Sequence, residues 1–332
     1  MNIKNIRHII MMLLWGTMMA AGPSLKGQDI HFSQVDINPV LFNPAYAGFF
    51  DGNGRFGVVY RNQWGTVSEP FSTFAATAEF AITRNRKHRN GLSAGLIFDS
   101  DRAGALSYGT TALSGVLSFF QSIGQQKSSL LSVAVLCGFG QMGFNPQSAS
   151  LYDPSEEFNH PQVSYKNLGA GIAFYHQFLD EFDIRIGLSA WNINKPNISY
   201  LGLDSVCIFP RITAYVRSEY RFYNDFSVLP IVAYQHQNEY SELLYGADVK
   251  WYLDHGRNNL TLSAGLLLRH KDAAMVNMSV EYDAFIFAFS YDANISYLAT
   301  ASHTIGAFEL GVVYRMASGR SKKKNSISCP VF

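Results

Sequence analysis

The feature that most constrains this chain is a regular alternation of apolar and polar side chains over long segments. In one of them Arg211, Arg217 and Arg221 fall on one side of the alternation, and Ile212 and Val216 fall on the other. Successive side chains of a β-strand point to opposite faces, so each such segment predicts a strand with one polar and one apolar face. About fourteen segments follow this pattern: 54–64, 70–82, 91–101, 105–119, 129–142, 165–178, 182–193, 208–223, 225–237, 241–253, 259–270, 273–282, 284–296 and 304–316.

The predicted strands are long, because most have roughly 10–15 residues, whereas soluble strands have about 5–6 and about 9–11 are enough to cross a bilayer. Only 15% of the residues are charged and 14% are aromatic, against roughly 25% charged residues in soluble domains. A soluble β-sandwich would not need so many aromatic residues at its strand ends. We therefore predict an all-β fold: a transmembrane antiparallel outer-membrane β-barrel of about 14 strands, with a short N-terminal plug-like or periplasmic segment.

The N-terminus predicts a signal peptide over residues 1–27. Lys4 and Arg7 precede an apolar run, and small residues follow it, with cleavage expected after Ala21 or near Gly27. A short membrane anchor is the alternative, but about 13 apolar residues fall short of the ~20 that span a bilayer as a helix. The remaining chain divides into an N-terminal segment, 28–53, the barrel, 54–317, and a basic tail, 318–332.

The polar faces of the predicted strands carry charges of both signs. Such a set would suit a water-filled pore or a filled, salt-bridged interior, and the presence of both signs favours the filled interior, since unpaired arginines in a low-dielectric lumen are costly. The residues expected to face the lumen are Arg55, Arg61, Arg185, Arg211, Arg217, Glu219, Arg221, Asp248, Lys250 and Glu281.

Four sequence blocks resemble the PorP/SprF family of type IX secretion proteins. They are HFSQVDINPVLFNPAYAGF at 31–49, YRNQW at 60–64, SYDANISYL at 290–298 and CPVF at 329–332. One departure is visible, because the family usually has a His-Glu pair where this chain has Phe308 and Glu309. The residues expected from these blocks to contact partners are Phe32, Ser33, Gln34, Asn38, Pro39, Asn43, Pro44, Tyr46, Gly48, Tyr60, Arg61, Gln63, Trp64, Tyr291, Asp292, Cys329, Pro330 and Phe332.

The resemblance implies a non-enzymatic outer-membrane barrel of a Gram-negative bacterium that works in type IX secretion and gliding motility. Its expected partners are outer-membrane lipid, periplasmic ring or anchor proteins, and the C-terminal domain of a large secreted adhesin. A net charge of +1 gives no argument for nucleic acid as a partner. The alternative function is an outer-membrane channel or transporter for small hydrophobic or polar molecules.

The N-terminal segment is rich in turn signals and aromatic residues. Asn38-Pro39 and Asn43-Pro44 predict two turns, since proline biases the preceding residue to extended conformations. We expect residues 28–52 to be ordered at the periplasmic mouth or inside the lumen, with Phe42 and Tyr46 packed on the inner wall. Two alternatives are a segment that only fills space and a direct contact with a secretion partner. The tail ends in Cys329 and Phe332, so we expect it to be docked rather than free.

Signals for catalysis are weak. GFGQMG at 138–143 matches a dinucleotide pattern, but the residues after it cannot open the helix that a phosphate site needs. We expect these glycines instead to allow curvature of a barrel strand or close packing of lumen side chains. The histidines lack metal-ligand spacing, and no serine is obviously placed beside one for a phospholipase. Cys137 is expected to pack as a small hydrophobe, and three cysteines leave at least one that is unpaired or in an intermolecular disulfide. The sequence therefore assigns no catalytic, cofactor-binding or metal-binding residue and no cofactor.

Overall fold

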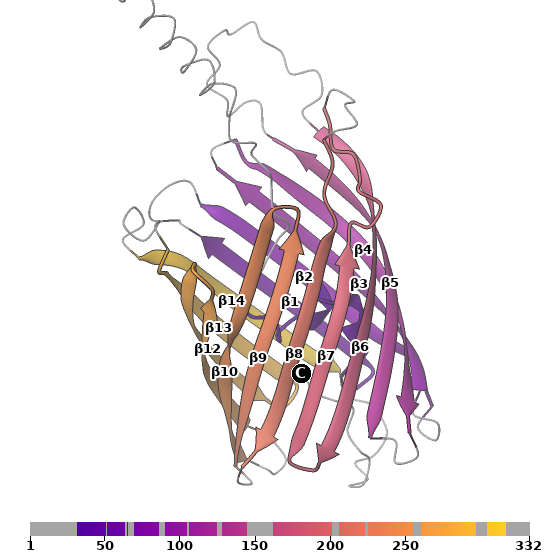
Figure 1. The fold of residues 1–332 in the computed structure, drawn as a ribbon, viewed down its shortest axis with the longest axis vertical. Coiled ribbons are helices and arrows are strands. Elements are labelled where there is room, and N and C mark those ends of the chain that lie inside the picture. Colours follow the sequence, from indigo (N-terminus) through magenta and orange to yellow (C-terminus); the bar gives the residue numbers. More distant parts are fainter. Residues whose placement is uncertain are drawn as a thin grey trace, which may run out of the picture.

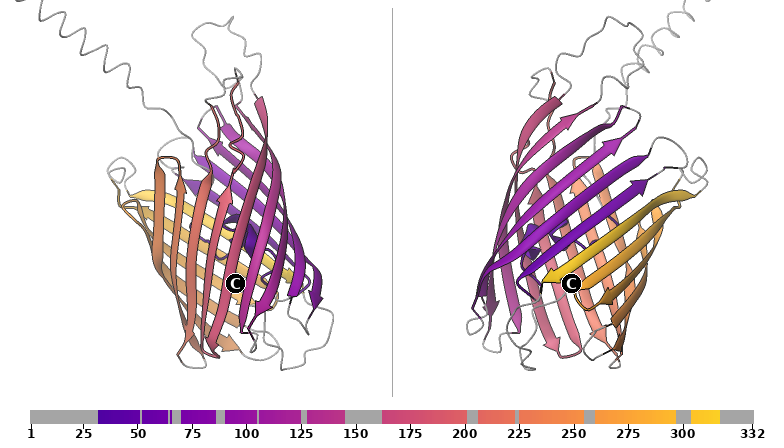
Figure 2. Two further views of the ribbon diagram at one scale, coloured as in Figure 1. Left: turned by 45° about the vertical axis from the view of Figure 1, so that its right-hand side comes forward. Right: turned by 180° about the vertical axis from the view of Figure 1, so that it is seen from behind.

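The computed structural model describes residues 32–50, 52–63, 65, 70–85, 90–104, 106–124, 128–144, 162–200, 206–222, 225–254, 260–296 and 304–316. In these residues fourteen antiparallel strands form a closed barrel, in which β14 pairs with β1 (Figures 1 and 2). The strands are β1 (Gly54–Gln63), β2 (Phe71–Asn85), β3 (Asn90–Ala103), β4 (Tyr108–Ile123), β5 (Ser129–Gly143), β6 (Gln162–Leu179), β7 (Phe182–Trp191), β8 (Arg211–Arg221), β9 (Phe226–Gln237), β10 (Tyr240–Asp254), β11 (Leu260–Arg269), β12 (Ala273–Tyr282), β13 (Phe285–Asn294) and β14 (Ile305–Met316).

The predicted antiparallel barrel of about 14 strands is confirmed, and every predicted segment forms a strand. The boundaries shift by a few residues where turns take over. β4 begins at Tyr108 rather than at 105, because Gly104 and Ser107 adopt φ angles of 68° and 49° and close a tight turn. The Ser107 N–H donates to the Gly104 carbonyl at 2.9 Å in that turn.

The two faces of each strand differ in the way that the alternation predicts. In β5, Val133, Val135 and Phe139 point outward, and Val135 is 60% exposed. Leu130 and Leu136 point inward and are buried. The same alternation in the neighbouring strands gives the barrel an apolar outer surface and a mixed, packed interior. Among the described residues, no helix is long and apolar enough to cross a membrane.

The two ends of the barrel differ in their connections. We call the end at which β1 begins and β14 ends the short-turn rim, and it carries the connections 86–89, 124–128, 180–181, 222–225, 255–259 and 283–284. We call the opposite end the long-loop rim, because it carries the two longest connections between strands, 144–161 and 192–210. The strands from β2 to β6 are long and extend the wall on one side of the barrel (Figure 1).

Residues 32–50, which we call the lumenal segment, lie inside the barrel (Figure 2). Each of the two Asn-Pro pairs starts a short 3₁₀ helix, η1 (Pro39–Leu41) and η2 (Pro44–Tyr46), so the two predicted turns are present. The apolar core lies between this segment and the inner wall. Val40, Tyr46 and Phe49 of the segment belong to it, together with inward-facing residues of the strands.

Candidate functional site

The lumenal segment is held at one end by a buried charge network that we call the latch, formed by Ser33, Arg61, Arg269, Asp292 and Glu309. The Glu309 carboxylate accepts the backbone N–H of Ser33 at 2.7 Å and that of the next residue at 3.0 Å. Arg61 donates to Glu309 at 2.6 Å and to Asp292 at 2.9 Å. The start of the described chain is therefore tied to the first strand and to the last two strands.

The Ser33 hydroxyl is the centre of the latch. It donates to Asp292 Oδ2 at 2.8 Å and accepts from Arg61 at 2.8 Å and from Arg269 at 2.9 Å. Arg269 also lies 3.3 Å from Asp292 and 3.4 Å from Glu242. Because these charges are buried, the network is stable only while every partner is in place. Arg269 ends β11 at the long-loop rim, which puts the latch at that rim.

The second Asn-Pro pair is wedged between two strands. Asn43 accepts the N–H of Ala45 at 2.8 Å through its side-chain oxygen, which caps η2. Its amide nitrogen donates to the backbone carbonyls of Ile172 in β6, at 3.0 Å, and Leu188 in β7, at 3.2 Å. One side chain therefore shapes the turn and fixes it to the wall.

Wall glycines make room for both asparagines. A Cβ on Gly171 would lie 2.2 Å from the Asn43 side-chain oxygen, and one on Gly187 would lie 2.7 Å from the Asn43 amide nitrogen. Asn38 of the first pair occupies the same kind of place, since a Cβ on Gly57 would lie 1.8 Å from its side-chain oxygen. That oxygen also accepts from the Thr77 hydroxyl at 3.1 Å. The glycines are thus sites of close approach by the lumenal segment.

Wall side chains satisfy the carbonyls of the lumenal segment. The Phe42 carbonyl accepts from Ser189 at 2.9 Å and from Thr213 at 3.0 Å. Ser132 donates to the Ala45 carbonyl at 2.7 Å, and Ser118 donates to the Ala47 carbonyl at 2.5 Å. A buried segment whose only regular structure is two short 3₁₀ helices needs such partners for the rest of its backbone. The inward serines and threonines of the wall supply them.

An aromatic cluster packs the middle of the segment against β8. The Tyr46 ring meets Tyr215 edge-on at 5.6 Å and Phe49 edge-on at 5.9 Å, and Phe42 lies 5.9 Å from Tyr215. Burial raises the pKa of the Tyr46 phenol well above its usual range, so the phenol stays neutral. The Tyr215 hydroxyl donates to Asp36 at 2.6 Å, which ties the cluster to the charged part of the lumen.

The segment leaves the lumen at the short-turn rim between charged side chains. Arg84, near the end of β2, donates to the Gly48 carbonyl at 3.0 Å and to the Phe50 carbonyl at 2.6 Å. The Gly48 N–H donates to Glu79 at 3.2 Å. Gly48 has a φ of 88° and faces Ser93, whose Oγ would lie 2.0 Å from an added Cβ. Glycine is required here by both conformation and space.

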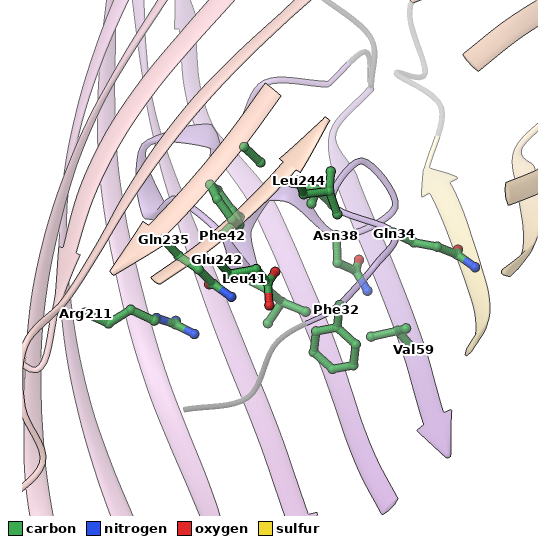
Figure 3. Close-up of a pocket in the computed structure, with 12 residues that line it drawn as sticks. Phe32, Gln34, Asn38, Leu41, Phe42, Val59, Arg211, Gln235, Glu242 and Leu244 are labelled. Atoms are coloured by element: carbon green, nitrogen blue, oxygen red, sulfur yellow. The ribbon is translucent and has the colours of Figure 1, made fainter. Parts of the chain in front are cut away.

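Two cavities lie beside the segment. The first, of about 30 Å³, lies between the segment and the strands β8 to β10; Figure 3 shows Gln34, Phe42 and Glu242 among its lining residues. The second, of about 80 Å³, lies between residues 33–37 and the strands β8 to β13, and it is lined by residues of both charge signs.

The structure brings most of the residues expected from the sequence blocks into the lumen. The group inside the barrel consists of Phe32, Ser33, Gln34, Asn38, Pro39, Asn43, Pro44, Tyr46, Gly48, Arg61 and Asp292. Gln63 ends β1 at the long-loop rim. Tyr60 and Tyr291 lie instead on the outer face, where Tyr291 is exposed. Trp64, Cys329, Pro330 and Phe332 lie outside the described residues.

Several residues of the site were missed. Glu309 was noted only as half of an altered family pair, yet its carboxylate is fully buried in the latch. Phe308 points outward beside Tyr60, with ring centroids 6.2 Å apart, so the departure from the family's histidine lies outside the latch. Arg269 and Gly171 were also missed. The sequence signal that could have identified Arg269 is its position on the inward-facing side of the alternation.

Two sequence motifs fall on the barrel wall. The 138–143 stretch lies in β5, where Cβ atoms on Gly138 and Gly140 would come within 2.2 Å of Ser114 Oγ and 2.3 Å of the Tyr165 ring. Close packing explains these glycines. The expectation that Cys137 packs as a small hydrophobe is wrong, because outward-facing Cys137 in β5 is exposed; Cys207 is also a free thiol.

Two serine–histidine pairs are present on the wall, although the sequence did not point to them. Ser129 Oγ lies 2.7 Å from His176 Nδ1, and Ser241 Oγ lies 2.9 Å from His236 Nδ1. Both are directly opposed cross-strand pairs at the ends of hairpins. Neither pair belongs to the lumenal site.

The fold defines the class of protein. A closed fourteen-stranded antiparallel barrel with an apolar outer face is an outer-membrane β-barrel, and the chain belongs in the outer membrane of a Gram-negative bacterium. The chain belongs to the family described as type IX secretion system membrane protein PorP/SprF, whose model matches residues 24–314. The family indicated by the four sequence blocks is thereby confirmed.

Solved structures share the fold at low sequence identity. The toluene transporter TbuX of Ralstonia pickettii superimposes with a TM-score of 0.52 at 10% identity, covering 83% of this chain and 92% of the other. The toluene transporter TodX of P. putida gives a TM-score of 0.52 at 8% identity, with coverages of 85% and 95%. The monoaromatic hydrocarbon channel CymD gives 0.50 at 9% identity, with coverages of 89% and 96%. The search of curated proteins finds no match.

Proposed function

We propose that this protein is a non-enzymatic barrel of the type IX secretion and gliding machinery whose lumen is closed by its own N-terminal segment. In this role it anchors periplasmic components, or it supports the export and surface attachment of a partner adhesin through the C-terminal domain of that adhesin. Family membership supports the assignment to the secretion machinery.

The observation that carries this proposal is the latch. A fourteen-stranded barrel falls between small barrels filled by side chains and porins of 16–18 strands that leave an aqueous channel. Here Arg61, Asp292 and Glu309 bind the lumenal segment by buried, charge-assisted hydrogen bonds. A segment fixed in this way favours a rigid platform for other proteins over an open pore.

The connections of the barrel support an orientation. Outer-membrane barrels have short periplasmic turns and longer external loops. By that rule the short-turn rim faces the periplasm, and the connections 144–161 and 192–210 face outward. Periplasmic partners would then meet the short-turn rim, at which β14 ends.

Affinity purification in mild detergent tests this proposal. A tag placed in the connection 144–161 leaves both the lumenal segment and the C-terminal tail intact. Mass spectrometry should identify type IX ring components or the C-terminal domain of a large surface protein, and the identity of the partner decides between the two roles. A similarly tagged unrelated barrel from the same cells is the control. Recovery of a clean monomeric barrel while the secretion proteins are expressed contradicts the proposal.

A second function is an outer-membrane channel for small hydrophobic or polar molecules. It is favoured by the barrel likeness to TbuX and TodX, which are described as toluene transporters. Conductance of the purified barrel in planar bilayers separates the two functions. A steady, porin-sized conductance of the intact chain supports the channel, whereas a closed baseline supports the platform.

A further inference from the structure

Pro230 is the only proline within the fourteen strands of the barrel. It is the fifth residue of β9, a strand that has a neighbour on each side. Proline has no backbone N–H to donate to a sheet, so within sheets it is normally confined to edge strands, to the first residue of a strand or to bulges. A closed barrel has no edge strands. An internal proline therefore indicates a local break in the hydrogen bonds of the wall.

The break lies between β8 and β9, which are adjacent in the wall (Figure 1). Residues 218–219 of β8 have no paired residue in β9, although the pairing continues on both sides of them. On one side Arg217 lies opposite Ile231, and on the other Tyr220 lies opposite Val228. The register is the same before and after the break, because no residue is inserted in either strand. The break is therefore an interruption of the ladder and not a bulge.

The missing backbone donor of Pro230 accounts for this interruption. Next to the end of β8, the Phe222 N–H donates to the Phe226 carbonyl at 3.1 Å. The backbone groups of a strand point alternately to its two neighbours, so Ser218, four residues earlier, also directs its N–H and C=O toward β9. By the register, the residue opposite Ser218 is Pro230, which can accept a hydrogen bond but cannot return one. The wall has a weak point at these two residues, which we call the seam.

The outer side of the seam faces the lipid. Pro230 is exposed, and so are Val216 and Val232, the outward residues beside it. β8 ends at the short-turn rim three residues after Ser218, which is roughly 10 Å along a strand. The seam therefore lies in the apolar part of the outer face, nearer the short-turn rim than the long-loop rim.

The larger lumenal cavity lies directly behind the seam. Its volume is about 80 Å³, and its lining includes Arg217 and Ile231, the opposed pair next to the seam. Aliphatic side chains from the lumenal segment and from β9, β11 and β13 give the cavity an apolar face: Val35, Ile37, Ile231, Leu267, Ile286 and Ala288. A single layer of strands, interrupted at the seam, thus separates this apolar face from the interior of the bilayer.

Charged side chains around the cavity are engaged in ion pairs with one another. The pairs are Arg217 with Asp36 and Asp248, Lys250 with Glu219, and Arg315 with Glu281. An entering charged group would have to disturb such a pair and lose its own hydration, which is costly in a low-dielectric interior. An apolar group needs no partner. The chemistry that best suits the cavity is therefore that of an apolar group.

The size of the cavity limits this apolar group to a slender one. An apolar cavity of roughly 150 Å³ can hold a benzene molecule. The cavity behind the seam has about 80 Å³, which is room for the end of one alkyl chain.

We propose that the seam between Ser218 and Pro230 is a lateral portal through which the acyl chain of a membrane lipid enters this cavity. A lumen that is closed to ions along the barrel axis can still accept an apolar chain from the side. This inference goes beyond the secretion role and does not depend on the identity of the secretion partner.

Photocrosslinking from the bilayer tests the proposal. The full chain is reconstituted in liposomes that contain a phosphatidylcholine with a diazirine on the terminal carbon of one acyl chain, and crosslinked peptides are mapped by mass spectrometry. We expect crosslinks to the lining residues Ile231, Leu267 and Ile286, in addition to crosslinks on the outer face. Crosslinks confined to the outer face of the intact chain overturn the proposal.

Pro230→Val supplies the missing backbone N–H to the seam. An added ladder hydrogen bond favours the closed wall, so we expect crosslinks to the lining residues to fall about fivefold. Val232→Ala is the matched control, because it alters the next outward side chain and keeps its N–H; those crosslinks should stay unchanged. The gel shift between heated and unheated samples checks that both variants are folded. Equal lumenal crosslinking in Pro230→Val and the intact chain rules out the portal, because the acyl chain then enters from a rim.

Filling the cavity is an independent test. Ile231→Phe adds volume beside the seam and leaves the backbone donors unchanged. We expect it to remove the crosslinks to Leu267 and Ile286 while those on the outer face remain. Val232→Phe, whose side chain points outward, is the control and should retain both sets. If Ile231→Phe leaves the crosslinks to Leu267 and Ile286 unchanged, the acyl chain does not occupy this cavity and the proposal fails.

Discussion

The side chain of Asn43 occupies the space that a side chain at Gly171 would fill. An added Cβ at 171 would lie 2.2 Å from the Asn43 side-chain oxygen, far inside van der Waals contact. The amide of Asn43 donates to the carbonyl of the next residue, Ile172, at 3.0 Å. A glycine in β6 and an asparagine near the start of the chain are therefore parts of one contact, although 128 positions separate them.

Replacing Gly171 by Ala should detach the lumenal segment from β6. Overpacking a well-packed site costs roughly 1–3 kcal/mol, and here it also breaks the hydrogen bonds of Asn43. We expect a lower unfolding temperature in detergent and faster proteolysis of residues 32–50. Gly115→Ala is the matched control, since its Cβ would meet only the Cys137 carbonyl at 3.8 Å. Equal losses in both variants would show that the contact with Asn43 does not matter.

Removing Arg61 should disrupt the latch. Arg61→Ala leaves the carboxylates of Asp292 and Glu309 buried without their shared cation, which costs roughly 3–5 kcal/mol. Equilibrium unfolding in detergent measures the loss. The control is Arg102→Ala, at an exposed position near the end of β3, for which we expect a change within about 0.5 kcal/mol. A loss at Arg61 as small as that at Arg102 contradicts the assignment of the latch.

Untying the lumenal segment should open the barrel to ions. In the test variant, a glycine-serine linker of equal length would replace residues 33–48. This change keeps the connection to β1 but removes the latch and both Asn-Pro turns. The altered chain should show stepwise conductance in planar bilayers, and the intact chain should stay closed, because the linker cannot bind the wall. The double variant Ser33→Ala and Asn43→Ala is a milder form and should give intermittent opening. An intact chain that conducts as much as the linker variant argues against closure by this segment.

A charge on the outer face should oppose insertion into the membrane. Val135 points outward from the middle of β5 and is 60% exposed, so Val135→Arg should cost roughly 2–4 kcal/mol if the site is near the bilayer midplane. Folding into liposomes, followed by the gel shift between heated and unheated samples, measures the effect. Val135→Leu is the control and should fold normally. Normal insertion of the arginine variant would place this face away from lipid.

Local regularities allowed the barrel to be predicted from the sequence. Alternation is a property of neighbouring residues, so strands such as β5 and β8 could be located to within a few positions. The two Asn-Pro turns were predicted for the same reason, since proline acts on the residue beside it. The inward charges were also visible, because they recur on one side of the alternation.

The pairings across the lumen could not be predicted in the same way. Whether Asn43 meets Gly171 depends on the strand register, the tilt of the barrel and the path of the lumenal segment, and none of these is a local property. Arg61 and Arg269 both donate to the Ser33 hydroxyl, although they lie on two strands that are far apart in the chain. An inward glycine gives a still weaker signal, because its meaning depends on the residue that approaches it.

The latch also joins the first and last strands of the barrel. Arg61 lies on the first strand, Glu309 lies on the last, and the two are neighbours only because β1 pairs with β14. The binding site for Ser33 is therefore incomplete until the final strand has closed the cylinder. The N-terminal segment can therefore bind inside the lumen only after the barrel is fully assembled. A bound N-terminal segment marks a barrel whose assembly is complete.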